Sequence, residues 1–589
     1  MCDCNFLCKI VCALVLAVAF LVNTVSGWFG GEDLIPTQHC YLGCTCYETT
    51  LEEETTVPST EEHTTIPTTE STTRPTVETT TKPVTEPSST PVTSKPFTKP
   101  TTEPTTESTT YEDISNPAVT YPTTEPSTEP ITTEPISTVP VTRPTTTKPP
   151  ETDPPPYVTE AEQYSLEVFG GSGDDIYRGI ASTSDGGYVV CGTTDSTDGD
   201  FAQAYTNNKW KKPYGFVARY SKTGSLRWIK AFASTSDSII LEDIAVLSDG
   251  TMAVVGYTKA TDYAANSESK GTYDAIILRL TSTGYLKTSK SFGGKNSDMF
   301  TCVTATENGF AVGGTTYSTT GDFEGLPGTS AIIMNFDANN NVVWKKYLHG
   351  NAASTIGGIA HDDEGNIFAT CLTSSTTDDF SVYEKLIGGY TDTVVLKYDK
   401  TGGYKWGFEI SSSGRDEFAA ITPDGKGGCV VAGNYELIPS NFPDGTLEGI
   451  HHCGNIDALV FRINPNGTQR WVKTLSGFED DFITDVVKTN GGFAISGYTA
   501  SANREFAVTG NEGGYDGFVS FINTNGATAS TISQAGTKND MATCLTYTTE
   551  GEIVALGKAQ SGDVDFAELN TYSNAVYIGY IGKFKIKTS

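Results

Sequence analysis

Three carboxylates at short spacing are the first residues of this 589-residue chain that could do chemistry. Asp195 and Asp198 are separated by two residues, and Asp200 follows after one more. Oxygen-rich loops of this kind bind Ca²⁺, so a calcium site is one interpretation. The spacing is not that of an EF-hand loop, and acidic surface loops are commonly only solvated. A protein without any cofactor is therefore the other interpretation.

Aromatic and imidazole side chains mark two further places. Trp210 stands in one long loop, and Phe442, His451 and His452 stand in another. These segments depart most from the internal repeat of the chain, so we expect any ligand to bind there. Cys453 would extend the histidine pair toward a transition-metal site, but no further His or Cys lies at ligand spacing. A disulfide bond explains this cysteine better.

Signatures of catalytic machinery are missing from the sequence. It contains no Ser/His/Asp order, no nucleophile elbow and no phosphate-binding loop. The aspartate boxes and arginine triad of sialidase-like proteins are missing as well. Paired carboxylates on a loop face would be the machinery left for a glycan-active enzyme, which stays an alternative rather than the main expectation.

A unit of about 56 to 65 residues recurs seven times between Tyr164 and Ser589. Each copy has two tight-turn signals, such as Asp249-Gly250 and Thr283-Gly284, between short runs of β-branched and aromatic residues. Such runs predict strands, and four strands in each copy predict an all-β fold, a seven-bladed β-propeller. The last copy lacks a fourth strand. The segment 164–169 has the form of one, so we expect an N-terminal strand to complete the last blade.

The two faces of such a ring differ. Short glycine turns gather on one face, while long and varied loops gather on the other, which is the expected binding face. An acidic or Asn residue followed by an aromatic residue recurs on that face in every copy. This repetition predicts a structural role, with the ring wedged between blades and the carboxylate capping the loop. The seven pairs are Asp200-Phe201, Asp262-Tyr263, Asp322-Phe323, Asp379-Phe380, Asn441-Phe442, Glu505-Phe506 and Asp565-Phe566.

Six cysteines of the repeats are expected to form disulfide bonds. Two of them share a site in the first strand of copies three and seven, and two more are interpreted as sharing a second-strand site in copies four and one. The same offset between neighbouring blades would then join both pairs. Buried free thiols that pack as small hydrophobic side chains are the alternative. The predicted pairs are Cys302 with Cys371, Cys191 with Cys544 and Cys429 with Cys453.

The chain before the repeats has a different composition. Residues 1–27 contain one apolar run followed by small residues, as in a signal peptide, and 28–47 form a short Cys-containing segment. Residues 48–160 are mostly Thr, Pro, Ser and Glu, which predicts a disordered, mucin-like stalk before a propeller at 161–589. We expect contact with a membrane only if the N-terminal apolar segment is retained.

Charge narrows the choice of partners. The formal net charge is −32 and the sequence pI is about 4.5, which argues against nucleic acid as a partner. A charge of this size mainly favours solubility. We therefore expect a monomeric propeller with an extracellular glycan or protein as its partner.

Three phrases of the first repeat resemble repeats of secreted bacterial β-propeller proteins: GGSGDD at 170–175, SDGGYVV at 184–190 and GTTDSTDGDF at 192–201. The resemblance implies an extracytoplasmic propeller and carries over no catalytic residue. Together with the stalk, it indicates a secreted or cell-surface binding or adhesion module that recognises a glycan or protein through its long-loop face. A structural component of an envelope or matrix, without a discrete ligand, is the first alternative.

Overall fold

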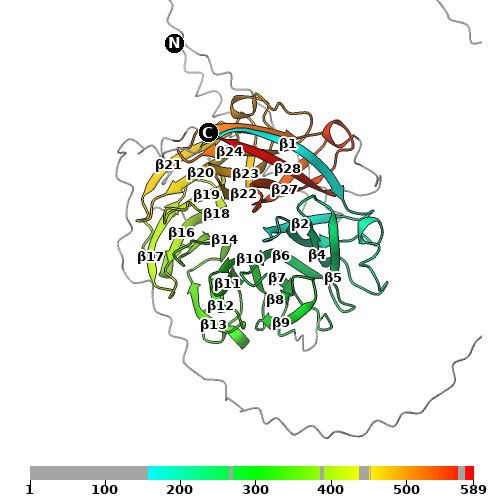
Figure 1. Ribbon diagram of the computed structural model, residues 1–589. Helices are drawn as coiled ribbons and strands as arrows, with labels where there is room; N and C mark the ends of the chain where they lie inside the picture. The colour runs from blue at the N-terminus through cyan, green and yellow to red at the C-terminus, as the bar shows by residue number, and fades with distance from the viewer. Residues whose placement is uncertain are drawn as a thin grey trace, which may run out of the picture. The chain divides into compact units, whose positions relative to one another are not determined.

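The computed structural model describes residues 157–263, 269–384, 386, 390–436, 450, 453–567 and 577–589. The predicted signal peptide, the Cys-containing segment and the stalk up to residue 156 lie outside the described residues. Seven four-stranded antiparallel sheets form the blades of a β-propeller, as predicted, with hardly any helix (Figure 1).

In six blades the strands follow the chain from the innermost to the outermost position. Blade one contains β2 (Asp175–Ser182), β3 (Tyr188–Thr194), β4 (Tyr214–Tyr220) and β5 (Leu226–Phe232). Blade two contains β6 (Ile239–Val246), β7 (Met252–Thr258), β8 (Asp274–Leu280) and β9 (Leu286–Phe292). Blade three contains β10 (Asp298–Thr306), β11 (Gly309–Thr316), β12 (Ser330–Asp337) and β13 (Val342–Leu348).

The next three blades have the same order. Blade four contains β14 (Ser354–His361), β15 (Ile367–Thr373), β16 (Asp392–Tyr398) and β17 (Tyr404–Ile410). Blade five contains β18 (Asp416–Pro423), β19 (Cys429–Glu436), β20 (Ile456–Ile463) and β21 (Gln469–Leu475). Blade six contains β22 (Asp481–Thr489), β23 (Gly492–Thr499), β24 (Asp516–Asn523) and β25 (Thr528–Gln534).

Blade seven joins the two ends of the propeller. Its strands are β26 (Asp540–Tyr547), β27 (Glu552–Ala559), β28 (Ile578–Thr588) and, as the fourth strand, β1 (Val158–Phe169). β1 pairs with β28 from Val158↔Thr588 to Phe169↔Gly579, which confirms the predicted closure. The strand begins before the predicted domain boundary at 161, because pairing continues to the end of β28.

Strand direction places the termini of the propeller on one face. The first-to-second and third-to-fourth connections are tight turns on what we call the short-turn face. The other connections lie on the opposite, long-loop face. β1 runs as a fourth strand, so Val158 lies at the short-turn face and Phe169 at the long-loop face. The chain before residue 157 therefore joins the propeller on the short-turn face.

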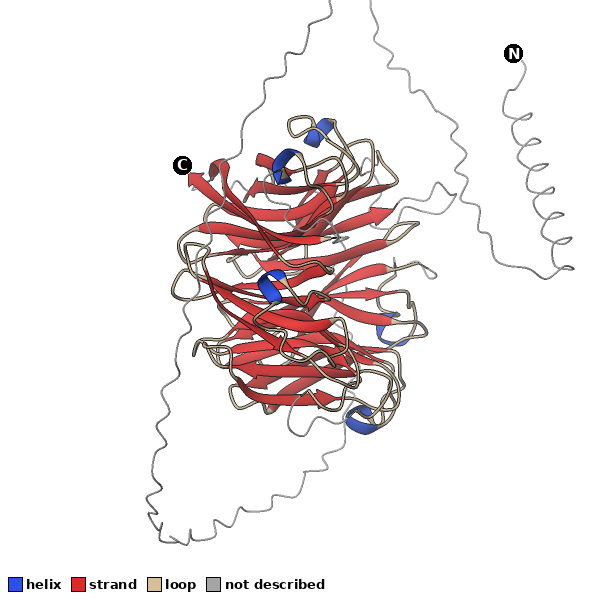
Figure 2. Cartoon of the chain, turned by 90° about the vertical axis from the view of Figure 1, so that its right-hand side faces the viewer, coloured by secondary structure: helices blue, strands red, loops and turns tan. Residues whose placement is uncertain are grey.

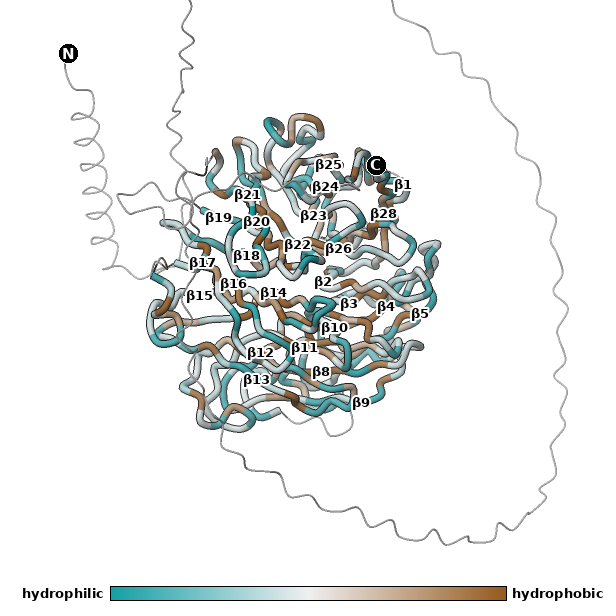
Figure 3. The backbone as a smooth tube through the Cα atoms, turned by 60° about the vertical axis from the view of Figure 1, so that its left-hand side comes forward, coloured by the Kyte–Doolittle hydropathy of each residue, from teal (hydrophilic) through white to brown (hydrophobic). Residues whose placement is uncertain are grey.

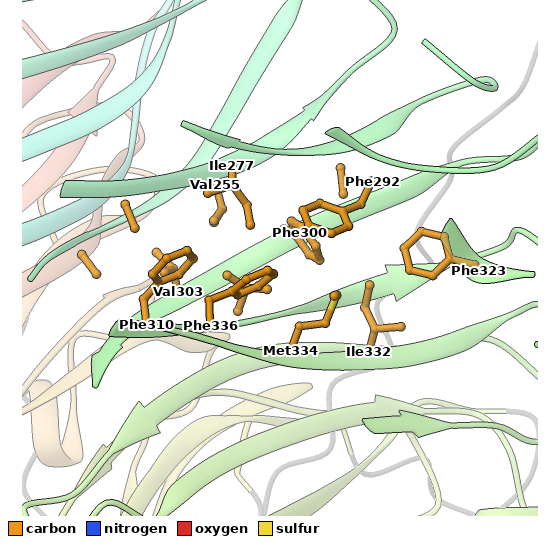
Figure 4. Packing of buried hydrophobic residues seen from close by; sticks show 14 of the residues in the cluster. Val255, Ile277, Phe292, Phe300, Val303, Phe310, Phe323, Ile332, Met334 and Phe336 are labelled. Atoms are coloured by element: carbon orange, nitrogen blue, oxygen red, sulfur yellow. The ribbon is translucent and has the colours of Figure 1, made fainter. Parts of the chain in front are cut away.

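Hydrophobic clusters between neighbouring blades form the core. Phe300, Phe310 and Phe336 of blade three pack against Val255 and Ile277 of blade two (Figure 4). Each sheet lies between two others, so strands such as β3 are buried along their whole length. Figure 3 shows hydrophobic residues along the strands inside the ring and hydrophilic residues in many of the connecting loops.

The acidic-aromatic pairs within the described residues, which exclude Asn441-Phe442, have the predicted structural role. In five blades the aromatic residue of the pair ends a short 3-10 helix in the connection after the second strand. Figure 2 shows these helices in blue among the loops. Phe201 is fully buried, with its ring 5.3 Å from Phe169 and 5.0 Å from Phe216. Gly170 N donates to Asp200 Oδ2 at 2.9 Å, so the carboxylate holds the connection between blades. The helices are η2 (Gly199–Phe201), η3 (Gly321–Phe323), η4 (Asp378–Phe380), η5 (Arg504–Phe506) and η6 (Val564–Phe566).

Candidate functional site

A channel runs along the propeller axis and is lined by the innermost strand of every blade. Its cavity has a volume of about 190 Å³. Arg178 of blade one pairs with Glu242 of blade two at 3.0 Å, and Asp243 and Asp485 also line the wall. The channel is therefore narrow and polar.

Two channel carboxylates hold neighbouring blades together. Asp243 Oδ2 accepts from Val303 N of blade three at 2.8 Å, and Asp485 Oδ2 accepts from Leu545 N of blade seven at 2.9 Å. Burial raises the pKa of Asp243 to about 7 and that of Asp485 to about 6. Both carboxylates thus stabilise the contact between neighbouring blades. A ligand would therefore bind at the mouth of the channel rather than inside it.

The channel mouth on the long-loop face is asymmetric. The second residue of each innermost strand lies there, half-buried, and its type changes from blade to blade. This departure from the repeat contrasts with the regular acidic-aromatic pairs. In blade order the seven residues are Ile176, Ile240, Met299, Thr355, Glu417, Phe482 and Met541.

A pocket opens beside this mouth between blades two and three, with a volume of about 480 Å³. Tyr257 at the end of β7 and Tyr273 before β8 form one wall, with ring centroids 5.5 Å apart at 85°. Met299 and Tyr317 belong to the blade-three side. Asn296 and Ser297 add polar groups from the connection between the blades.

Backbone hydrogen bonds fix the pocket walls. Asp298 N donates to Tyr273 O at 2.8 Å, and Tyr317 N donates to Ser297 O at 3.0 Å. Lys259 lies outside the lining, with Nζ 5.6 Å from the Tyr273 ring centroid and 3.2 Å from Asp237 Oδ2. Among the described lining residues none is charged, so the pocket combines tyrosine rings with hydroxyl and amide groups.

Blade six repeats the tyrosine pair of blade two. Tyr498 and Tyr515 occupy the equivalent strand positions, with ring centroids 5.4 Å apart at 83°. There Phe482 stacks on Tyr498 at 4.7 Å and covers one face of that ring. Ile240 takes the place of Phe482 in blade two. The blade-two pair is therefore the better platform for a ligand.

Trp210, predicted as a ligand contact, lies in the long loop of blade one. Its ring is half-buried and packs 5.5 Å from Tyr205 and 5.8 Å from Tyr214. The structure thus places Trp210 inside the packing of its own loop, away from the residues that line the pocket. Phe442, His451 and His452, the other predicted contacts, lie outside the described residues.

The three aspartates of the calcium interpretation have separate partners. Asp198 Oδ1 accepts from Ser172 N at 2.8 Å, whereas Asp200 binds Gly170. The main-chain oxygen of Asp195 accepts from Lys212 Nζ. Within the described part of the chain, no group of three or more His, Cys, Asp or Glu residues is arranged to hold a metal ion. The carboxylates of Asp198 and Asp200 thus stabilise loops, whereas Asp195 Oδ1 is buried without a hydrogen-bond partner. Calcium binding at these three residues stays a prediction.

The six propeller cysteines are free thiols, so the predicted disulfide bonds are not formed. Cys371 pairs with Ile356 before a β-bulge, whereas Cys191 pairs with Gly179 after the equivalent bulge. The two cysteines therefore differ by one register position, and a shift of one residue reverses the face of a side chain. The predicted offset between blades was wrong for this reason.

The fold separates two of the three predicted cysteine pairs. Cys191 faces the core between blades one and two, whereas Cys544 faces the core between blades seven and one. Cys302 and Cys371 do share the core between blades three and four, where Cys302 Sγ approaches the carbonyl oxygen of Ile356, the cross-strand partner of Cys371, at 3.9 Å, but both are free thiols. Cys429 begins β19 near the short-turn face, but Cys453 precedes β20 at the long-loop face.

The pocket tyrosines were not among the residues predicted from the sequence. In the sequence, Tyr257 and Tyr273 look like ordinary residues of strands. Asn296 and Tyr317, which lie beside them in the pocket, come later in the chain, toward the next repeat. The sequence signal for these tyrosines is their position in the repeat, because aromatic residues stand at the equivalent positions in only some of the seven copies. Aligning the seven copies residue by residue would have exposed it.

No protein-family model and no curated protein matches this sequence. Among solved structures, three of those similar to this chain are as follows. A protein of unknown function from Dyadobacter fermentans is 13% identical, with a TM-score of 0.38 over 72% of this chain and 99% of that chain. Sqt1 from Chaetomium thermophilum is 10% identical, with a TM-score of 0.36 over 73% and 100% of the two chains. Extracellular domains 1–2 of Drosophila semaphorin 1b are 9% identical, with a TM-score of 0.37 over 72% and 87%.

Similarities of this degree say nothing about chemistry, which depends on the site. β-Propellers commonly serve as protein-binding modules. The part of the chain that the structure describes contains no helix of the length and apolar character needed to cross a membrane.

Proposed function

We propose that this chain is a secreted or cell-surface binding module whose propeller recognises a glycan through the long-loop face. The ligand binds in the pocket between blades two and three. The observation that carries the proposal is the lining of this pocket, in which Tyr257, Tyr273 and Tyr317 stand among uncharged hydroxyl and amide groups.

The chemistry of the lining favours a sugar. Tyrosine combines a flat apolar ring with a polar hydroxyl. A sugar ring has the complementary character, since its C–H face packs on aromatic rings and its hydroxyl groups accept and donate hydrogen bonds. The uncharged lining is also compatible with a neutral ligand.

The shape of the site also favours a glycan over a folded protein partner. A volume of about 480 Å³ lies within the range of about 300–1,000 Å³ typical of small-molecule pockets. A stable protein interface buries about 800 Å² on each partner, far more surface than the seven lining residues of this pocket offer. A protein ligand remains an outcome of the test.

The topology suits display of this face. The chain before residue 157 joins the short-turn face, whereas the pocket lies on the long-loop face. An extended Thr/Pro-rich segment on that side would present the pocket away from its attachment point. The resemblance of the first repeat to secreted bacterial propellers supports the extracellular location.

A glycan-array screen of the full chain, with and without Ca²⁺, tests the proposal. Tyr273→Ala should weaken binding of any glycan captured by the wild type about tenfold, because an aromatic contact contributes about 0.5–1.5 kcal/mol beyond its buried area. Tyr285→Ala is the matched control, since Tyr285 is an exposed tyrosine beside a turn of the short-turn face.

Each result of the screen has a consequence. Binding that is lost in Tyr273→Ala and kept in Tyr285→Ala supports the pocket as the site. A blank array under both conditions overturns glycan recognition and favours a protein partner or a structural role in an envelope or matrix.

A further inference from the structure

A second cavity adjoins the pocket between blades two and three. Its volume is about 200 Å³, and Thr355, Leu372 and Glu417 of blades four and five belong to its lining. Tyr317 lines both cavities. The two cavities therefore follow the channel mouth from blade two to blade five on either side of Tyr317, and together we call them the track.

Tyr317 is held firmly at the boundary between the cavities. Its N–H donates to Ser297 O at 3.0 Å, and its carbonyl oxygen accepts from Asn296 Nδ2 at 2.7 Å. The residue is nevertheless 37% exposed. A fixed backbone with an exposed ring can serve as a shared wall for two ligand groups.

The second cavity has a lining of the same general chemistry. Thr355 and Leu372 are paired across β14 and β15, and Ser354 Oγ lies 2.8 Å from Thr373 Oγ1. At the far end, Glu417 forms an ion pair with Arg415 at 2.5 Å. Hydroxyl groups, the apolar side chains of Ala353 and Leu372 and an ion-paired carboxylate suit a polyhydroxylated ligand.

We infer that the two cavities are consecutive subsites for a linear, neutral oligosaccharide that passes over Tyr317. This inference rests on the proposed function and adds the length and course of the ligand. The second cavity, at about 200 Å³, is smaller than the roughly 300 Å³ at the low end of small-molecule pockets. It is therefore better suited to extend an occupied pocket than to bind a ligand alone.

The track predicts that the affinity for an oligosaccharide increases with the number of its sugar units. A short oligosaccharide fills the larger pocket, and further sugar units reach Thr355, Leu372 and Glu417 only after passing Tyr317. Binding of the first sugar units already includes the loss of translational and rotational entropy on association. Each contact of a further sugar unit therefore adds directly to the affinity. Affinity should level off once both cavities are filled.

The test measures binding of three neutral oligosaccharide ladders to the full chain by calorimetry. The ladders are β-1,4-linked glucose, α-1,4-linked glucose and β-1,4-linked N-acetylglucosamine, each one to six units long. We expect at least one ladder to gain tenfold or more in affinity between two and four units. Thr355→Trp fills the second cavity and should abolish this gain while keeping the affinity for short members.

Two further variants keep the result interpretable. Ile176→Trp places the same bulk at the equivalent position of blade one, outside both cavities, and should keep the gain with length. Glu417→Gln changes the far end of the track with little change of volume, and it should reduce the gain in affinity with ligand length. This variant serves as the test if Thr355→Trp fails to fold.

The outcomes separate this inference from the proposed function. Binding on the glycan array without any dependence on length, or a gain that Thr355→Trp and Glu417→Gln leave unchanged, overturns the two-subsite inference alone. A blank array together with three blank ladders overturns both.

Discussion

Single residues hold neighbouring blades together at the turns. Trp406 of blade four covers Gly467 in the third-to-fourth turn of blade five, and its Nε1 donates to Pro465 O at 2.8 Å. Gly467 has a φ of 83°, and a Cβ there would lie 2.8 Å from Trp406 Cγ. The turn thus requires glycine for its conformation and for its contact.

Gly467→Ala should destabilise the propeller more than Gly250→Ala. Gly250 has a similar φ of 77° but no atom within 4 Å of an added Cβ. The control variant should therefore cost only the left-handed strain of roughly 1–2 kcal/mol. Overpacking against Trp406 should add about 1–3 kcal/mol, measured as a lower denaturation midpoint. Equal midpoints for the two variants would contradict this account of the tryptophan contact.

Among the elements, β1 has the largest effect on the fold. It supplies the outer strand of blade seven and pairs along its whole length with the C-terminal β28. Ser589 N also donates to Tyr157 O at 2.9 Å, which extends the contact to the last residue. Its removal would expose the edge of β28 and open the core beside Val158.

Deleting residues 1–169 should lower the melting temperature sharply and promote aggregation, whereas deleting residues 1–156 should leave the propeller stable. The two deletions differ only in the segment that pairs with β28. Thermal unfolding and light scattering measure both effects. A propeller that melts at the same temperature after both deletions would show that the strand does not close the ring.

The whole molecule contains many buried carboxylates with raised pKa values. Burial raises the pKa of Asp416 to about 8, that of Asp243 to about 7 and that of several others to about 6. The unfolded chain ionises its aspartates near pH 3.9. Because the folded state binds these protons more tightly, ionisation costs stability as pH rises toward 8. The others are Asp175, Asp481, Asp485, Asp516 and Asp540.

The melting temperature should therefore fall as pH rises from about 6.5 to 8, because Asp243 up to about pH 7 and Asp416 up to about pH 8 still hold a proton in the folded state that the unfolded chain has already lost. Below this window His361 acts in the opposite direction, since burial lowers its pKa. Asp243→Asn removes one titrating group and should make the fall shallower. Differential scanning calorimetry across the window checks the slope; a melting temperature that rises with pH would refute the sign.

The sequence alone determined the repeat, the number of blades and the closure by β1, because hydrophobic spacing and turn residues act locally. It also identified the structural role of pairs such as Asp200-Phe201 from their recurrence. The cysteine pairs could not be derived in this way. A bulge in each innermost strand shifts the register by one residue, and only the folded sheet shows on which side Cys191 and Cys371 fall relative to it.

The tertiary structure alone decided where a ligand could bind. Tyr257 and Tyr317 are 60 residues apart in the sequence and belong to different repeats. They line one pocket because blades two and three pack side by side around the channel. Local patterns determine strands and turns, but the contacts between blades depend on the curvature of the closed ring, which no single repeat encodes.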